Sequence, residues 1–109
     1  MNDNSDETLR SAIKEQIGII AWKSLARFFA GGTAVAIDAE LDLADVAFQF
    51  SQNNRAVVER WVSEGQVNRV SDEQAKTWFE TDATVAAVVV NPWVLVQEVK
   101  METTEGNKQ

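Results

Sequence analysis

Apolar side chains recur at helical spacing near the start of the chain, at Leu9, Ala12, Ile13, Ile17 and Ile20. Ser5 is a suitable N-cap, so this spacing predicts a helix that begins at residue 6. A second apolar stripe within 22–29 is rotated relative to the first, and Gly18 lies between the two. We therefore expect two helical segments with a kink or short break at Gly18, ended by the glycine pair at 31–32.

The middle of the chain predicts one strand followed by two helices. Residues 33–38 are apolar on both faces and bounded by turn residues, which is typical of a buried strand. Asp42 can cap a helix that runs to Phe50. A polar break separates it from a second helix over 54–64, for which Gly65 is a natural end.

The next segment predicts a short strand over 66–70 and a further helix. Residues 71–74, SDEQ, form a capping box, in which Ser71 caps the helix and Gln74 can reach back to the Ser71 backbone. We expect the helix to bury the apolar residues of its inner face, which are Ala75, Trp78 and Phe79.

The stretch 82–99 is the most apolar in the chain and has the only proline, Pro92, near its middle. A single strand of this length would span on the order of 50 Å, whereas a domain of this size has a radius of gyration of only about 13 Å. Asn91-Pro92 suits the first two positions of a type I turn. We therefore expect two strands, 84–90 and 93–99, with the first central and the second at an edge of the sheet.

Together these elements predict a single α+β domain over residues 6–100, in which a small, largely antiparallel sheet packs against about four or five helices. Residues 1–5 are predicted to be a disordered tail and residues 101–109 a polar tail. The two helices within 42–64 follow a strand, are separated by a short turn and precede a hairpin. This order resembles a winged helix, although the turn lacks its usual glycine.

The composition narrows the chemistry that the protein can perform. Its 109 residues include no cysteine and no histidine, which removes thiolate nucleophiles, imidazole bases and the usual zinc or copper ligands. The start of the chain lacks the apolar core of a signal peptide, and no apolar run reaches transmembrane length. We therefore expect a cytoplasmic protein with no membrane association and no cofactor.

One acidic stretch, DAELDLAD, suggests a metal site because hard cations prefer oxygen ligands; its acids are Asp38, Glu40, Asp42 and Asp45. It lacks the glycine of a calcium loop, and Gln49 stands where that loop has its bidentate glutamate. A carboxylate pair for acid–base catalysis could come from Asp42, Asp45, Asp72 and Glu73. Because their positions at helix N-termini explain all four, we predict no catalytic, cofactor-binding or metal-binding residues and no enzymatic activity.

Two surfaces remain as candidates for binding. The predicted edge strand has an apolar run that could pair with a partner protein, or with a second copy in a homodimer, at Trp93, Val94, Leu95 and Val96. The helix-turn-helix-like segment and the strand after it supply three candidate nucleic-acid contacts, Arg55, Arg60 and Arg69. Glu59 and Glu64 cancel the charge of that helix, and 17 acidic against 10 basic residues give the chain a net charge of −7.

The leading hypothesis is therefore a non-enzymatic protein-interaction or regulatory module with an unknown protein partner. The first alternative is a winged-helix-like, nucleic-acid-associated protein, although we do not expect so acidic a chain to bind nucleic acid. The second alternative is a small-ligand-binding domain or enzyme, which a deep pocket with convergent carboxylates would favour. A basic face around the three arginines would favour nucleic acid, and an apolar face would favour a protein partner.

Four segments resemble domain-of-unknown-function family 2288, a group of small bacterial proteins; the segments are AWKSLARFFAGG, LDLADVAFQF, GQVNRVSDEQAKTWF and DATVAAVVVNPWVLVQ. The resemblance spans nearly the whole chain, from about Glu7 to Gln97. It implies a standalone, single-domain bacterial protein. It implies no activity, cofactor or catalytic residue.

Overall fold

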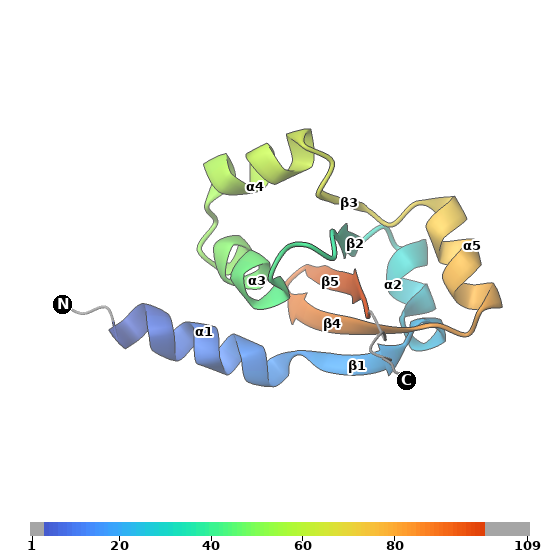
Figure 1. Cartoon of the computed structure of the whole chain (residues 1–109), viewed down its shortest axis with the longest axis horizontal. Coiled ribbons are helices and arrows are strands. Elements are labelled where there is room, and N and C mark those ends of the chain that lie inside the picture. Colours follow the sequence, from blue (N-terminus) through green and yellow to red (C-terminus); the bar gives the residue numbers. More distant parts are fainter. Residues whose placement is uncertain (1–3, 100–109) are drawn as a thin grey trace, which may run out of the picture.

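A mixed sheet lies at the centre of the molecule (Figure 1). The computed structural model describes residues 4–99, and within them the sheet has five strands: β1 (Gly18–Ala21), β2 (Ala34–Ile37), β3 (Val67–Arg69), β4 (Thr84–Val90) and β5 (Trp93–Glu98). Their order across the sheet is β1-β4-β5-β2-β3. β5 and β2 are parallel, and the other neighbouring strands are antiparallel.

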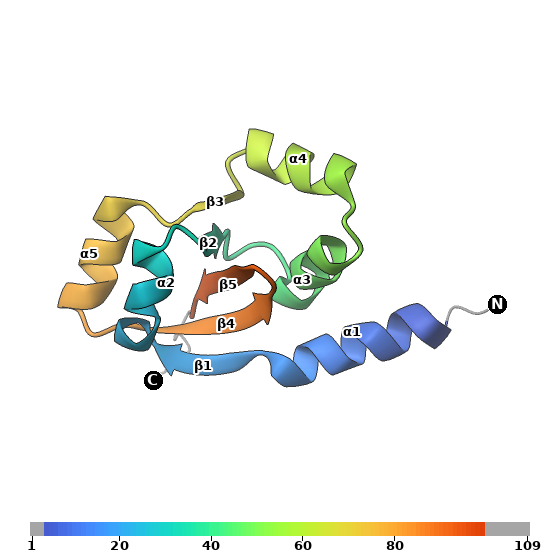
Figure 2. The ribbon, with the colours of Figure 1, turned by 180° about the vertical axis from the view of Figure 1, so that it is seen from behind.

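Helices pack on both sides of this sheet. They are α1 (Asn4–Gln16), a 3₁₀ helix η1 (Trp22–Leu25), α2 (Ala26–Ala30), α3 (Leu43–Ser51), α4 (Arg55–Ser63) and α5 (Asp72–Glu80). Figure 2 shows α1 and α3 at one side and α2 and α5 at the other. The predicted α+β class, with a largely antiparallel sheet against helices, is confirmed.

The start of α1 differs from the prediction. The helix begins at Asn4, within the predicted tail, so Ser5 lies inside the helix and not at the position before it. The other residues of the two predicted tails, 1–3 and 101–109, lie outside the described residues.

The sheet separates two apolar cores, because successive side chains of a strand point to opposite faces. On one side, Val35 and Leu95 pack against α1 and α3. On the other side, Val94 and Val96 pack against η1 and α5. β5 is therefore apolar on both faces, and Val94, Leu95 and Val96 are 3%, 0% and 0% exposed.

The turn predicted at Asn91-Pro92 is confirmed. β4 and β5 form an antiparallel hairpin in which Val90 is paired with Trp93 across these two residues. Asn91 and Pro92 therefore occupy the two central positions of the turn and not the first two positions of the predicted type I turn.

Three predicted helix ends are also confirmed. The Asp42 carboxylate accepts a hydrogen bond from the Ala44 backbone N–H at 3.1 Å, and the Ser71 hydroxyl accepts one from the Gln74 N–H at 3.1 Å. Gly65 follows α4 with a φ of 78°, in the left-handed region that favours glycine.

The two helical segments expected on either side of Gly18 are present, but a strand joins them instead of a kink or short break. The first helix stops before Gly18, and the next residues form β1, in which Ile19 lies opposite Ala86 of β4. Ile20 packs against a core while Ile19 is 64% exposed, which is the alternation of a strand. β1 covers part of an edge that the longer strand β4 would otherwise leave unpaired.

The strand predicted for the sheet edge is in fact its middle strand. β5 pairs with β4 on one side and with β2 on the other, so the edge strands are β1 and β3. The parallel pairing places Ala34 beside Val94 and Ile37 beside Gln97. These partners are far apart in the sequence, and no local pattern predicts that they meet.

Phe79 does not lie in the core as expected. α5 buries Ala75 and Trp78, whereas Phe79 is 55% exposed. Consecutive helical residues are rotated by about 100°, so a residue directly after a buried one can face solvent. The Lys23 ammonium lies 5.2 Å from the centre of the Phe79 ring.

The winged-helix resemblance is limited to the segment α3–turn–α4. Asn53, with a φ of 56°, takes the left-handed position in this turn that a glycine would usually take. The hairpin that would serve as a wing, β4–β5, instead forms the interior of the mixed sheet.

Candidate functional site

Like the short helix α2, α4 has no residue that is fully buried against the rest of the molecule. It carries an apolar stripe, Val57, Val58, Trp61 and Val62, yet it has no buried residue. Trp61 packs at the margin of a core, whereas Val62 is 48% exposed. Figure 1 shows α4 connected to α3 and to β3 by the turns at its two ends.

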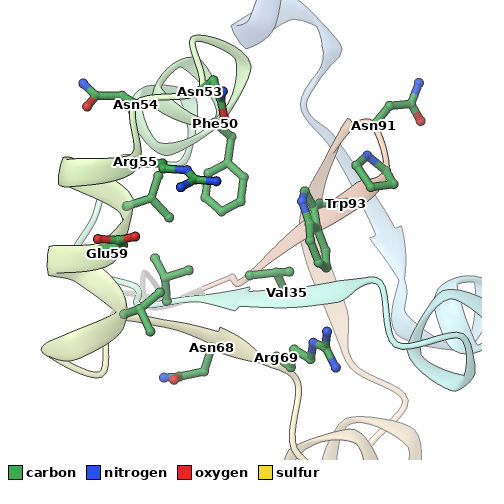
Figure 3. A pocket seen from close by; sticks show the side chains of 14 residues that line it. Val35, Phe50, Asn53, Asn54, Arg55, Glu59, Asn68, Arg69, Asn91 and Trp93 are labelled. Carbon is green, nitrogen blue, oxygen red and sulfur yellow. The ribbon is translucent and has the colours of Figure 1, made fainter.

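A cavity of about 700 Å³ lies between α4 and the sheet; we call it the α4 cleft. Its apolar lining comes from β2, α3, α4, β3, β5 and the turn before β5, namely Val35, Phe50, Val58, Val62, Val67, Pro92 and Trp93. Figure 3 shows Phe50 and Trp93 extending into it from α3 and β5. The cleft has both an aromatic and an aliphatic surface.

Polar side chains surround this apolar lining. Arg55 and Glu59 come from α4 and Arg69 comes from β3. Amide side chains complete the rim, at Asn53, Asn54, Asn68 and Asn91. The guanidinium carbon of Arg69 lies 6.0 Å from the centre of the Trp93 ring, a distance at which cation and ring attract each other.

Neither arginine of the cleft has an ion-pair partner within residues 4–99. The ion pairs found in that range are Arg10–Asp45 at 2.9 Å and Lys23–Asp82 at 3.4 Å, both remote from the cleft lining. Because Glu59 is the one carboxylate among the described residues of the lining, basic groups outnumber acidic ones here, in contrast to the acidic chain as a whole.

The structure brings some of the sequence-predicted site residues together and separates others. Arg55 and Arg69 both line the cleft, but Arg60 does not. Trp93 is half-buried and also lines the cleft. The apolar run that follows it, 94–96, is buried on both faces of β5 and offers no surface to a partner.

The other lining residues were not predicted as a site. Phe50 and Val58 lie on helical stripes that indicate core packing, and Val35 is an ordinary residue of a buried strand. The sequence feature that could have indicated the site is the amphipathic pattern of 54–64 together with its arginines. This pattern does not show whether the apolar face of the helix is buried within the chain or left open.

Three of the four acidic residues considered for metal binding make contacts within the chain. Asp38 accepts a hydrogen bond from the Glu40 N–H at 2.9 Å, Asp42 caps α3, and Asp45 pairs with Arg10 across α1 and α3. Within the described part of the chain, no group of three or more acidic side chains is placed to hold a metal ion.

Comparison with known proteins places the chain in a family. A family model described as "Protein of unknown function (DUF2288)" matches residues 8–98. The chain belongs to this family. The chain is also similar to the NMR solution structure of PA1075 from Pseudomonas aeruginosa, with 40% sequence identity, 84% of each chain covered and a TM-score of 0.74.

These comparisons give the DUF2288 chain a fold and a relative but no activity. No curated protein matches it significantly. Among the residues that the structure describes, no helix is both long and apolar enough to span a membrane.

Proposed function

We propose that this DUF2288 protein is a non-enzymatic protein-interaction module that binds a segment of a partner protein in the α4 cleft. The observation that carries this proposal is that α4 has an apolar stripe but no residue buried by its own chain. A nine-residue helix is marginally stable by itself, so apolar side chains from a partner would stabilise both the helix and the complex.

The size and lining of the cleft support a binding role. Its volume of about 700 Å³ falls within the range of roughly 300–1,000 Å³ that is common for binding sites. Trp93 and Phe50 supply aromatic surface, which contributes strongly at interfaces. Acid–base catalysis gains little support, since the described lining offers one carboxylate, Glu59, and the sequence has no histidine or cysteine.

The partner in this proposal is a different protein. The homodimer expected from the sequence relied on an exposed edge strand at 93–99, and that strand is interior. A bacterial, cytoplasmic setting is part of the proposal and is supported by the relative from Pseudomonas aeruginosa and by the cysteine-free composition.

A nucleic-acid role is the second candidate, because Arg55 and Arg69 face the same cleft. Glu59 lines the same cleft as these arginines and offsets part of their charge. The net charge of −7 also opposes the approach of a polyanion. The charge distribution therefore supports a protein segment more than a nucleic-acid strand.

Selection of peptides from a random display library against the full chain tests the proposed function. We expect enriched peptides that shift the indole N–H signal of Trp93 in NMR spectra. The paired change Val58→Gln and Val62→Gln should weaken the binding of these peptides by about tenfold. The bound peptide buries the exposed apolar surface of both valines, and glutamine would lose that stabilisation.

The matched control is Ala56→Gln, an exposed position of α4 that does not line the cleft. It should leave peptide affinity unchanged. If selection yields no peptide whose affinity depends on Val58 and Val62, the α4 cleft is not a protein-binding site and the proposal is wrong.

A further inference from the structure

We propose that the segment bound in the α4 cleft is an acidic peptide, in which carboxylates flank the apolar side chains. This inference rests on the proposed function and specifies the chemistry of its partner. It follows from the charges, the amide groups and the aromatic surface of the cleft.

The two arginines occupy different sides of the cleft. Figure 3 shows Arg55 on α4 beside Phe50, and Arg69 on β3 near Val35 and Trp93. Neither has an ion-pair partner within residues 4–99. A guanidinium group binds a carboxylate through two parallel hydrogen bonds, so an acidic residue at each end of an apolar segment would complement this arrangement.

The amide groups of the rim suit a peptide backbone. The side-chain nitrogen of Asn54 donates to the Gln49 side chain at 2.8 Å, and that of Asn68 donates to the Gly65 carbonyl at 3.0 Å. Among the described residues, no donor is found for the side-chain oxygen of either asparagine. A peptide backbone N–H can donate to these oxygens, whereas the phosphate groups of a nucleic-acid backbone cannot, so its bases or sugars would have to supply the donors.

Two further features disfavour a nucleic-acid strand as the occupant. Glu59 lies in the lining and would repel a ligand that carries one phosphate for each nucleotide. The Arg69 guanidinium carbon lies over the Trp93 ring at 6.0 Å from its centre, so a base that stacked on this ring would have to displace Arg69. An acidic peptide has few carboxylates, and it can place them at the two arginines and away from Glu59.

The decisive experiment combines variants of the protein with variants of the selected peptides. We expect the peptides enriched against the wild-type chain to contain Asp or Glu on both sides of an apolar core. The paired change Arg55→Gln and Arg69→Gln should weaken them by about tenfold, which is the size expected for two exposed ion pairs. Arg60→Gln is the matched control, since Arg60 lies on the same helix but outside the cleft lining.

The same peptides with amides in place of their carboxylates complete a double-mutant cycle between the peptide acids and the two arginines. They should bind the wild-type chain about tenfold more weakly, and the arginine changes should then have no further effect. Peptides that depend on Val58 and Val62 but contain no acidic residue would overturn this inference and leave the proposed function intact.

Two other outcomes would also overturn it. If no selected peptide depends on the cleft, the proposed function is wrong and the inference with it. If single-stranded oligonucleotides bind more tightly than any peptide, and the same arginine changes weaken them, the occupant is a nucleic acid. Heteronuclear NMR spectra of each variant establish that it is folded before its affinity is measured.

Discussion

The tryptophan side chains differ in how far the surrounding helices and strands bury them. Trp22 is 2% exposed and packs edge-on against Trp78 and Phe29, with ring centres 5.0 and 6.0 Å away. Trp61 on α4 and Trp93 on β5 are half-buried. A large aromatic ring stabilises the fold in proportion to the surface that it removes from water.

We expect Trp22→Ala to lower the free energy of unfolding by about 3–5 kcal/mol, as large core truncations do. Helical spacing alone predicts the same loss for Trp61→Ala, but its half-buried position reduces our expectation to about 1–2 kcal/mol. Urea denaturation of both variants measures the difference. Equal losses would mean that α4 is packed as firmly as the core.

At the level of elements, the position of α4 depends on the residues at its two ends. Asn53 before it and Gly65 after it both have positive φ angles, 56° and 78°. These left-handed residues lie in the turns that connect α4 to α3 and to β3 (Figure 1). The α4 cleft is lined by residues of this helix and of the sheet strands. The cleft is therefore a consequence of turn chemistry as well as of apolar packing.

We expect Gly65→Ala to lower the free energy of unfolding by about 1 kcal/mol, because a Cβ atom disfavours the left-handed conformation. A Cβ there would meet no atom within 4 Å, so the loss reports backbone conformation alone. Gly65→Asn should lose less, since asparagine tolerates positive φ better.

Gly18→Ala is the matched control, because Gly18 has an ordinary backbone conformation and equally open surroundings. It should be neutral or slightly stabilising, since alanine lowers the entropy of the unfolded chain. A destabilisation as large as that of Gly65→Ala would contradict this explanation, as measured by thermal unfolding.

For the whole molecule, the sign and distribution of charge bear most directly on function. The net charge is −7, yet the described lining of the α4 cleft contains two arginines and one glutamate. A local basic site on an acidic protein attracts a short acidic segment at close range. It does not attract a long polyanion from a distance, because the whole chain repels it.

We therefore expect no sequence-specific binding of duplex DNA with a Kd tighter than about 1 μM at near-physiological salt, whereas specific binders typically reach roughly 10⁻⁸ M. Selection from genomic fragments, followed by titration, is the measurement. Submicromolar binding to a defined site, weakened by Arg55→Ala or Arg69→Ala, would favour the nucleic-acid alternative.

The sequence by itself determined the features that depend on neighbouring residues. The caps at Asp42 and Ser71, the left-handed end at Gly65 and the turn at Asn91-Pro92 follow from local hydrogen bonding and backbone sterics. The α+β class follows from the alternation of strand and helix periods along the chain.

The tertiary structure decided which elements are neighbours. Because β5 pairs with β2 in parallel, Trp93–Glu98 lies in the middle of the sheet and not at the expected edge. Residues 18–21 have helical spacing in the sequence, but they form β1 because they pair with the edge of β4. Arg55 and Arg69 could be selected from the sequence by their charge, but Phe50 and Val58 could not be told from core residues. Whether an apolar stripe is buried or exposed depends on contacts between distant segments, and such contacts leave no periodic signal in the sequence.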